Sequence, residues 1–131
     1  MTARPAGHPK VREPFVVRFP WPVRAAWQNG THGHWATLAR AVKRQRRDAH
    51  LIALGARPPA YGPSERLSVA LKGHPTRRGR VDAQNLLGAM KGALDGLADA
   101  LGADDSRFDV SCTIADPVPG GEVVVTVEAA E

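Results

Sequence analysis

The chain has 131 residues, a formal net charge of +5 and a single cysteine. This length is sufficient for one domain with its own apolar core, without disulfides or structural zinc. Cys112 cannot pair within the chain, which favours a reducing, cytoplasmic setting. No segment approaches the ~20 apolar residues that span a membrane, and the first residues lack the apolar centre of a signal peptide. The composition therefore excludes a membrane protein and predicts one that is not exported.

The charges are divided unequally between the two halves of the chain. Up to Arg80 there are sixteen lysines and arginines against three acids, a net of +13; from Val81 onward there are two against ten, a net of −8. The basic half would attract a polyanion, in a reaction that weakens as salt rises. An acidic cluster in such a protein repels its ligand unless a divalent cation intervenes. A merely solubilising surface is the alternative interpretation.

The first elements are an arm and a strand. Residues 1–13 are polar and basic, without periodicity, and we expect a flexible N-terminal arm. Residues 14–131 are expected to form one domain. Within it, residues 14–19 are β-branched and aromatic and predict a first strand, which Pro20 and Pro22 end.

The segment after this strand predicts a loop. Residues 23–35 contain turn signals at Gly30 and Gly33. They also contain His32 and His34, whose spacing suits a transition metal, but no cysteine or third histidine is placed to complete a site. A loop role that includes contact with DNA is the favoured interpretation. Three tryptophans could stack on unpaired bases, although packing in a core or interface is their commoner role: Trp21, Trp27 and Trp35.

The first predicted helix covers residues 35–54, with Gly55 near its end. The residues expected to face the core are Leu38, Val42, Ala49 and Ala53 or Leu54. The other faces are strongly basic and carry one acid, Asp48, whereas a solvated helix usually mixes both signs. We therefore predict that this helix binds nucleic acid through Arg40, Lys43, Arg44 and Arg47.

The remaining pattern predicts three strands and a second helix. The strands are residues 65–72, 108–114 and 122–128, and the helix is residues 85–101. Prolines and paired glycines in residues 115–121 predict a turn or hairpin loop between the last two strands. The order β-α-β-α-β-β predicts an α+β fold with a mixed sheet and two helices on one face.

The stretch Arg80 to Ser106 reads RVDAQNLLGAMKGALDGLADALGADDS. It places Asp82 at the start of the second helix and the pair Asp104-Asp105 beyond its end, a layout typical of a metal site. Gln84 and Lys91 are seven residues apart and would point the same way on a continuous helix. A basic run leads into Asp82, and we predict that it contacts DNA: Arg77, Arg78 and Arg80.

This order of an arginine, Asp-x-x-Asn-Leu, a lysine, Leu-Asp-Gly-Leu and Asp-Asp-Ser resembles the RusA family of Holliday junction resolvases, phage and bacterial endonucleases that cut four-way DNA junctions. Residues 19–22, Phe-Pro-Trp-Pro, look like the family's early Leu-Pro-Trp-Pro-Pro turn. The resemblance spans residues 15–127 and is specific within residues 80–106. It implies a RusA-like homodimer in the cytoplasm that acts in DNA recombination and repair, with no small-molecule cofactor.

The resemblance also implies roles for individual residues. Asp82 and Asp105 would hold Mg²⁺, or Mn²⁺ as a substitute, and Asp104 would share or replace the second role. Lys91 matches the family's lysine if three residues are counted as inserted after Asn85, and its ammonium would stabilise phosphate charge in the transition state. The metal would neutralise the scissile phosphate and position the attacking water.

One residue departs from the family pattern, which is usually Asp-x-Asp-Asn. Gln84 stands at the second aspartate. A neutral amide can coordinate Mg²⁺ through its oxygen, but it removes a negative charge and lowers metal affinity. Three outcomes are open, in this order of preference. The enzyme works with the remaining carboxylates, another acid such as Asp109 substitutes, or the chain binds branched or duplex DNA without cutting it.

Each residue of this site also has a purely structural interpretation. Asp82 suits a helix N-cap, Lys91 suits an i,i+4 pair with Asp95, and Asp104-Asp105 suits an ordinary turn. Taken singly, these interpretations are the more economical ones. Taken together, with arginines before and the matching helix between, the residues favour a site.

The length of the second helix sets a geometric condition on the site. A helix over residues 85–101 is about 25 Å long. The four steps from Leu101 to Asp105 recover at most about 14 Å. Asp82 and Asp105 of one chain therefore meet only if the chain folds back or the helix is shorter. Otherwise, acids from two chains combine across a dimer.

Overall fold

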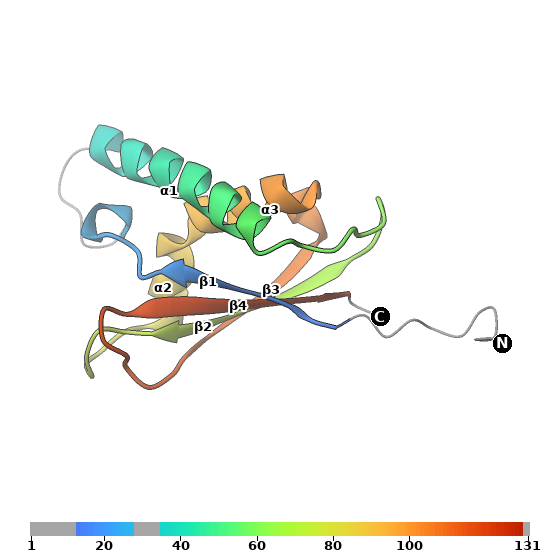
Figure 1. The fold of residues 1–131 in the computed structure, drawn as a ribbon. Coiled ribbons are helices and arrows are strands. Elements are labelled where there is room, and N and C mark those ends of the chain that lie inside the picture. The colour runs from blue at the N-terminus through green and yellow to red at the C-terminus, as the bar shows by residue number, and fades with distance from the viewer. Residues whose placement is uncertain (1–12, 28–34, 130–131) are drawn as a thin grey trace, which may run out of the picture.

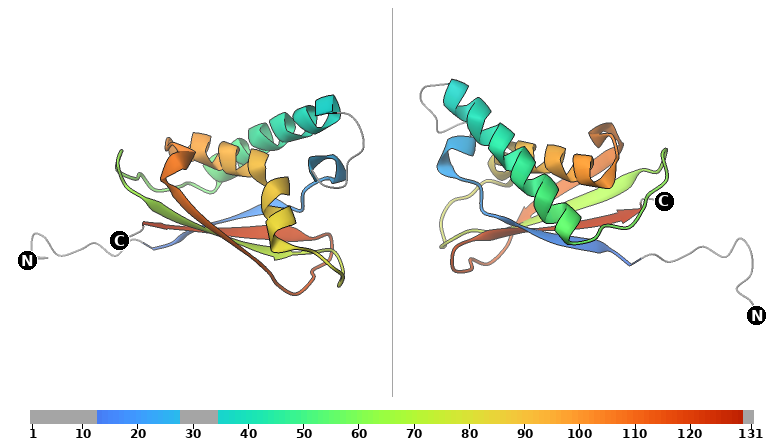
Figure 2. Two further views of the ribbon diagram at one scale, coloured as in Figure 1. Left: turned by 180° about the vertical axis from the view of Figure 1, so that it is seen from behind. Right: turned by 45° about the horizontal axis from the view of Figure 1, so that its top comes forward.

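A computed structural model of the chain describes residues 13–27 and 35–129. These residues form one four-stranded mixed sheet, with three helices on a single face of it (Figures 1 and 2). The predicted α+β class and single domain are confirmed. Most of the expected N-terminal arm, together with His32 and His34, lies outside the described residues.

The elements follow the order β-α-β-α-α-β-β. The strands are β1 (Phe15–Pro20), β2 (Leu67–His74), β3 (Phe108–Ile114) and β4 (Glu122–Ala129). The helices are α1 (Trp35–Gly55), α2 (Ala83–Ala89) and α3 (Lys91–Leu101). Two 3-10 turns are η1 (Arg24–Ala26) and η2 (Asp105–Arg107). The first helix agrees closely with its prediction, whereas the second is divided in two.

The strand order is β1-β4-β2-β3, so β4 lies in the interior of the sheet. It is antiparallel to both of its neighbours, and β2 and β3 are parallel. The predicted turn is present, since the Gly121 N–H donates to the Val118 carbonyl oxygen at 2.9 Å. The alternative of a hairpin between the last two strands is wrong, because residues 115–121 carry the chain across the end of β2. Two backbone hydrogen bonds hold this crossing, from the Ala115 N–H to the Gly73 oxygen at 2.8 Å and from the Val118 N–H to the Pro75 oxygen at 3.0 Å.

The core lies between the sheet and the helices. Alternate residues of each strand point into it, because successive side chains of a strand point to opposite faces and the helices cover one face of the sheet. The buried strand residues are Phe15, Val17, Phe19, Leu67, Val69, Leu71, Phe108, Val123, Val125 and Val127. The helices contribute Ala49, Ala53, Leu86, Met90, Ala93, Leu97 and Ala98. On α1, Ala53 rather than Leu54 faces inward, since Leu54 is 47% exposed.

Two glycines of α3 allow α1 to pack directly against its backbone. A Cβ atom on Gly92 would lie 2.7 Å from the Gln45 Oε1 atom and closer still to the Val42 carbonyl oxygen. A Cβ atom on Gly96 would lie 2.8 Å from the His50 backbone nitrogen and would also meet the Arg46 carbonyl oxygen. Neither position has room for a side chain, so the two helices touch backbone to backbone.

The predicted helix over residues 85–101 is broken at Met90, which has φ −99° and ψ 10°. The two halves have different packing partners. Leu86 of α2 is buried beside Gly73 of β2, where a Cβ atom would collide with the leucine side chain. By contrast, α3 follows α1. A straight helix cannot satisfy both contacts, and the axis turns between them (Figure 1).

The side chain of Gln45, on α1, bridges this break. Its Oε1 atom accepts a hydrogen bond from the Ala93 N–H at 3.1 Å, and its Nε2 atom donates to the Ala89 carbonyl oxygen at 3.0 Å. Ala93 is in the first turn of α3, whose N–H groups lack partners within the helix. Met90, the N-cap residue, supplies no side-chain hydrogen bond. Gln45 therefore caps α3 from a neighbouring helix.

We expect Gly96→Ala to lower the free energy of unfolding by about 1–3 kcal/mol, because the added methyl group forces the two backbones apart. Gly88→Ala is the matched control. A Cβ atom there meets no other atom within 4 Å, so alanine should raise stability by up to about 1 kcal/mol through helix propensity. Urea unfolding followed by circular dichroism measures both. Equal stability of the Gly96 variant and the wild type would contradict the close approach.

Replacing Gln45 with methionine tests the bridge, because methionine keeps the volume and removes both hydrogen bonds. The Ala93 N–H and Ala89 carbonyl lose their side-chain partner, and we expect a loss of about 1–3 kcal/mol in the free energy of unfolding. Gln84→Met, at an exposed position of α2, should leave stability within about 0.5 kcal/mol. If the two variants unfold at the same urea concentration, Gln45 does not secure the break.

Candidate functional site

Asp82 and Gln84 lie together at the start of α2, and both are exposed. The Asp82 Oδ1 atom accepts a hydrogen bond from the Gln84 N–H at 2.7 Å, so Asp82 is the N-cap of the helix. A cap of this type contributes about 1 kcal/mol. The Oδ2 atom has no hydrogen bond to any of the described residues. Asp82 can therefore cap the helix and offer an oxygen to a ligand at the same time.

Asp104 and Asp105 lie at the other end of the helical segment. The Asp104 Oδ1 atom accepts a hydrogen bond from the Ser106 N–H at 3.0 Å and caps the η2 turn. This hydrogen bond lowers the pKa of the Asp104 carboxyl. Asp105 occupies the first position of η2 and is exposed. Both carboxylates are accessible to solvent.

Lys91 is the first residue of α3, and its side chain is exposed. Its Nζ atom lies 3.9 Å from the Asp95 Oδ2 atom, the i,i+4 pair that the spacing indicates. Such pairs contribute about 0.3 kcal/mol, which leaves the ammonium free to exchange partners. The continuous helix that would place Lys91 and Gln84 on one face is absent, because the helix is broken at Met90 between them.

The acids lie at opposite ends of the sheet. Strands β2 and β3 are parallel, with Leu67 opposite Phe108. The η2 turn immediately precedes β3, so Asp105 lies where these strands begin; α2 starts at the end where β2 finishes (Figures 1 and 2). Strands of this length span about 23 Å. Within residues 13–27 and 35–129, no group of three or more His, Cys, Asp or Glu side chains could hold a metal ion.

Asp109 lies at the same end as Asp105, near the start of β3. Its carboxylate receives two hydrogen bonds from Arg66, at 2.6 and 3.3 Å, and these lower the pKa of Asp109. Asp109 is therefore far from the α2 start and cannot replace, within one chain, the carboxylate that Gln84 lacks. The ion pair is a second reason why Asp109 cannot take this role, since both of its carboxylate oxygens already accept hydrogen bonds from Arg66.

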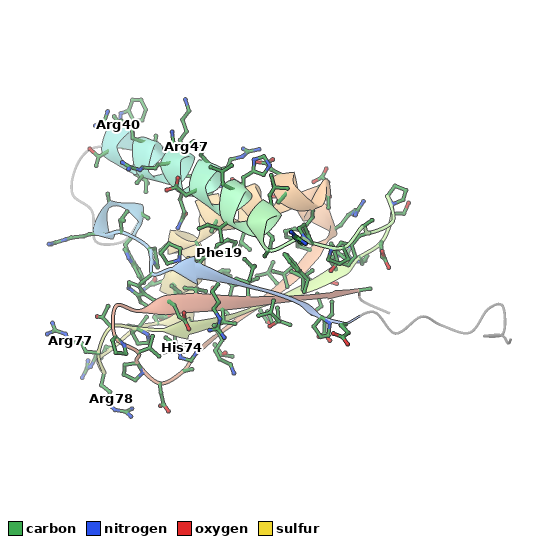
Figure 3. All side chains as sticks on the ribbon, viewed as in Figure 1. Phe19, Arg40, Arg47, His74, Arg77 and Arg78 are labelled. Carbon is green, nitrogen blue, oxygen red and sulfur yellow. The ribbon has the colours of Figure 1, made fainter. Side chains whose placement is uncertain are left out.

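The basic side chains of α1 fall into two groups. Arg46 forms a two-pronged ion pair with Asp99 of α3, at 2.7 and 2.9 Å, which lowers the pKa of Asp99. The residues predicted to bind DNA lie on the outer faces instead: Arg40, Lys43, Arg44 and Arg47. Arg47 lies 3.7 Å from Asp48, and the other three have no ion pair within the described part of the chain. Figure 3 shows Arg40 and Arg47 directed away from the sheet.

Arg77, Arg78 and Arg80 lie on the exposed loop between β2 and α2. Figure 3 shows Arg77 and Arg78 projecting beyond the end of the sheet. An Arg78 guanidinium nitrogen lies 3.7 Å from an Asp116 oxygen, but both side chains are more than 80% exposed, so the pair is weak. This cationic loop leads directly to Asp82. Anion-binding groups and a carboxylate therefore occupy one end of the molecule.

Four ion pairs that are distant in sequence join the basic first half of the chain to the acidic second half. They are Arg18–Glu122, Arg46–Asp99, Arg66–Asp109 and Arg78–Asp116. Part of the charge asymmetry in the sequence is thus neutralised inside the fold. Sequence patterns alone could not separate these arginines from those left for a ligand, because the pairing depends on sheet register and helix packing.

Comparison with known proteins shows a relative in Xylella fastidiosa, strain Temecula1, called an uncharacterized protein. The two chains are 34% identical over 123 residues, which cover 89% of this chain and 78% of the relative. The chain therefore belongs to the same family as that bacterial protein. No protein-family model matches the chain. None of the described helices is both long and apolar enough to cross a membrane.

Proposed function

We propose that the chain is a metal-dependent endonuclease that cuts four-way DNA junctions, with each metal site shared between two protomers of a homodimer. The observation that carries this proposal is the exposed end of the molecule where the cationic loop meets Asp82. Its guanidinium groups suit backbone phosphates, and Asp82 retains an unused oxygen beside them. Contacts of this kind fix the position of DNA without reading its bases, which suits recognition of a branched shape.

The proposal of a dimer follows from the distance between the acidic residues within one chain. In one chain, Asp82 and the Asp104-Asp105 pair lie at opposite ends of β2 and β3. A two-fold axis perpendicular to these strands reverses their direction, so the α2 start of one protomer faces the η2 end of its partner. Two such composite sites form at once. A pair of equivalent sites also matches a junction, whose opposing strands are related by two-fold symmetry.

The donor atoms suit Mg²⁺ chemically, since all are oxygens. Asp82 supplies a carboxylate and Gln84 an amide oxygen, and the partner adds the carboxylates of Asp104 and Asp105. When bound, the metal supplies charge neutralisation on the phosphate and an activated water. The chain's own contribution is to hold the DNA backbone with the loop arginines. Lys91, loosely paired with Asp95, is available to place positive charge near the phosphate.

A second function, binding to DNA junctions without cutting, is favoured by one specific feature. Gln84 stands beside Asp82 at a position where the family pattern has a second carboxylate, so this end of the proposed site carries one negative charge fewer. A site with fewer charges binds Mg²⁺ more weakly. In this case the basic surfaces would still bind DNA, and hydrolysis would be slow or absent.

A complementation assay tests the shared site. We expect Asp82→Asn and Asp105→Asn each to reduce cleavage of an end-labelled four-way junction by at least about 100-fold with Mg²⁺. When the two variants are mixed and allowed to exchange subunits, each mixed dimer contains one intact composite site. The mixture should therefore nick the junction on one strand.

If both ligands came from one chain, every site in the mixed dimer would lack a carboxylate and the mixture would stay inactive. Linear duplex and EDTA serve as controls for junction selectivity and metal dependence. A wild-type protein that binds the junction without cutting it, and cuts it after Gln84→Asp, would instead establish the second function.

The DNA surface is tested by the salt dependence of junction binding. Lys43→Ala with Arg47→Ala removes two charges from the outer face of α1. We expect the slope of log K against log salt concentration to fall by about two. The matched control, Arg18→Ala with Arg66→Ala, removes two arginines that are paired within the fold and should change the slope much less. Identical slopes for the two double variants would remove α1 from the DNA surface.

A further inference from the structure

A pocket of about 140 Å³ opens between α1, the turn after β1 and the junction of α2 with α3. Its lining includes Trp21, which is half-buried, and Phe19 and Met90, which are almost completely buried. The centroids of the Trp21 and Trp27 rings are 5.8 Å apart, at an interplanar angle of 41°, so the two rings are in contact. The pocket therefore presents flat and polarisable apolar surfaces.

The space exists because three alanines line it where larger residues would close it. Ala41 and Ala49 belong to α1, and Ala93 to α3. Ala49 and Ala93 are almost completely buried, so they lie at the inner limit of the pocket. Ala41 is half-buried, near the outer part of the pocket. An apolar space of this kind in a well-packed domain is a candidate binding site.

Two opposite charges stand among the lining residues. Arg44 and Asp48 are one turn apart on α1 and both are exposed. Arg44 has no ion pair among the described residues. The Asp48 carboxylate has one ion-pair partner among them, Arg47, at the long distance of 3.7 Å. Gln45, which also lines the pocket, has its amide engaged at the helix break. The groups left for a ligand are thus one cation and one carboxylate.

We propose that this pocket receives an unpaired nucleobase of the bound DNA. The inference rests on the proposed function and extends it to a specific contact at the branch point. The base packs against the Trp21 ring, an exocyclic amine donates a hydrogen bond to Asp48, and the adjacent phosphate binds Arg44. A nucleotide combines a flat ring, an N–H donor and an anion, whereas an aliphatic chain offers only apolar surface.

The location supports this assignment. Arg44 lies on the same helix as Arg40, Lys43 and Arg47, so a strand held by the outer faces of α1 passes the pocket mouth. Extruding a base is least costly where it is already unpaired, as at a distorted branch point. Stacking of a base on aromatic side chains tolerates different bases, whereas Asp48 favours those with an exocyclic amine.

The experiment compares two four-way junctions that differ at one position beside the branch. One carries a single unpaired adenine and the other an abasic residue there. We expect the wild-type protein, in EDTA to prevent cutting, to bind the adenine junction about tenfold more tightly, as measured by fluorescence anisotropy. Thymine, which has no exocyclic amine, should give a smaller gain, and Asp48→Ala should remove the difference between adenine and thymine.

Ala41→Leu fills the pocket from a half-buried position and should abolish the tenfold preference while leaving affinity for the abasic junction unchanged. Ala39→Leu makes the same change on an exposed part of α1 that does not line the pocket, and should keep the preference. Thermal unfolding checks that both variants fold. Equal binding of the adenine and abasic junctions by the wild type, or a preference that survives Ala41→Leu, would overturn the inference and leave DNA binding intact. Binding of neither junction would overturn the proposed function as well.

Discussion

The amide of Gln45 is the contact on which the arrangement of the helices depends. It caps the first turn of α3 and binds the last carbonyl of α2, so the segment after Asp82 can turn at Met90. The turn lets α2 pack on β2 while α3 follows α1, and Gly92 and Gly96 then bring α1 into backbone contact with α3. A polar side chain inside a helix interface is costly unless both of its groups are satisfied, and here both are.

This arrangement also decides where the charged groups lie. Since α2 and α3 together return along the length of β2, the carboxylates at their two ends cannot converge. Arg46 is turned toward Asp99 by the same helix contact, where it forms a two-pronged ion pair. The remaining cations of α1 are exposed. The loop after β2 carries Arg77 and Arg78 to the end of the sheet (Figure 3), and Asp82 follows at the start of α2. A ligand with spaced negative charges is the kind that this surface suits.

Local features of the fold were predictable from the sequence, and features that depend on distant residues were not. The strands and the first helix follow from alternation and from apolar spacing within α1, which are properties of neighbouring residues. The break at Met90 depends on Gln45, which is distant in sequence, and on the two different surfaces that α2 and α3 cover. No hairpin precedes β4, because proline and glycine specify that the chain turns but do not specify which strand β4 then pairs with. The N-cap role of Asp82, the helix pair of Lys91 and a turn at Asp104-Asp105 were predicted from the sequence. The distance between these residues was not, because it depends on the parallel pairing of β2 with β3.

The position of β4 has a consequence for how the protein is made. It follows the other three strands in the sequence, yet it lies between β1 and β2 and supplies the hydrogen bonds that join them. A nascent chain that has not yet released β4 from the ribosome contains β1 and the β2–β3 pair with no strand to connect them. The edges of β1 and β2 that pair with β4 lack these hydrogen-bond partners during that interval. The sheet is therefore complete only after β4 has been made.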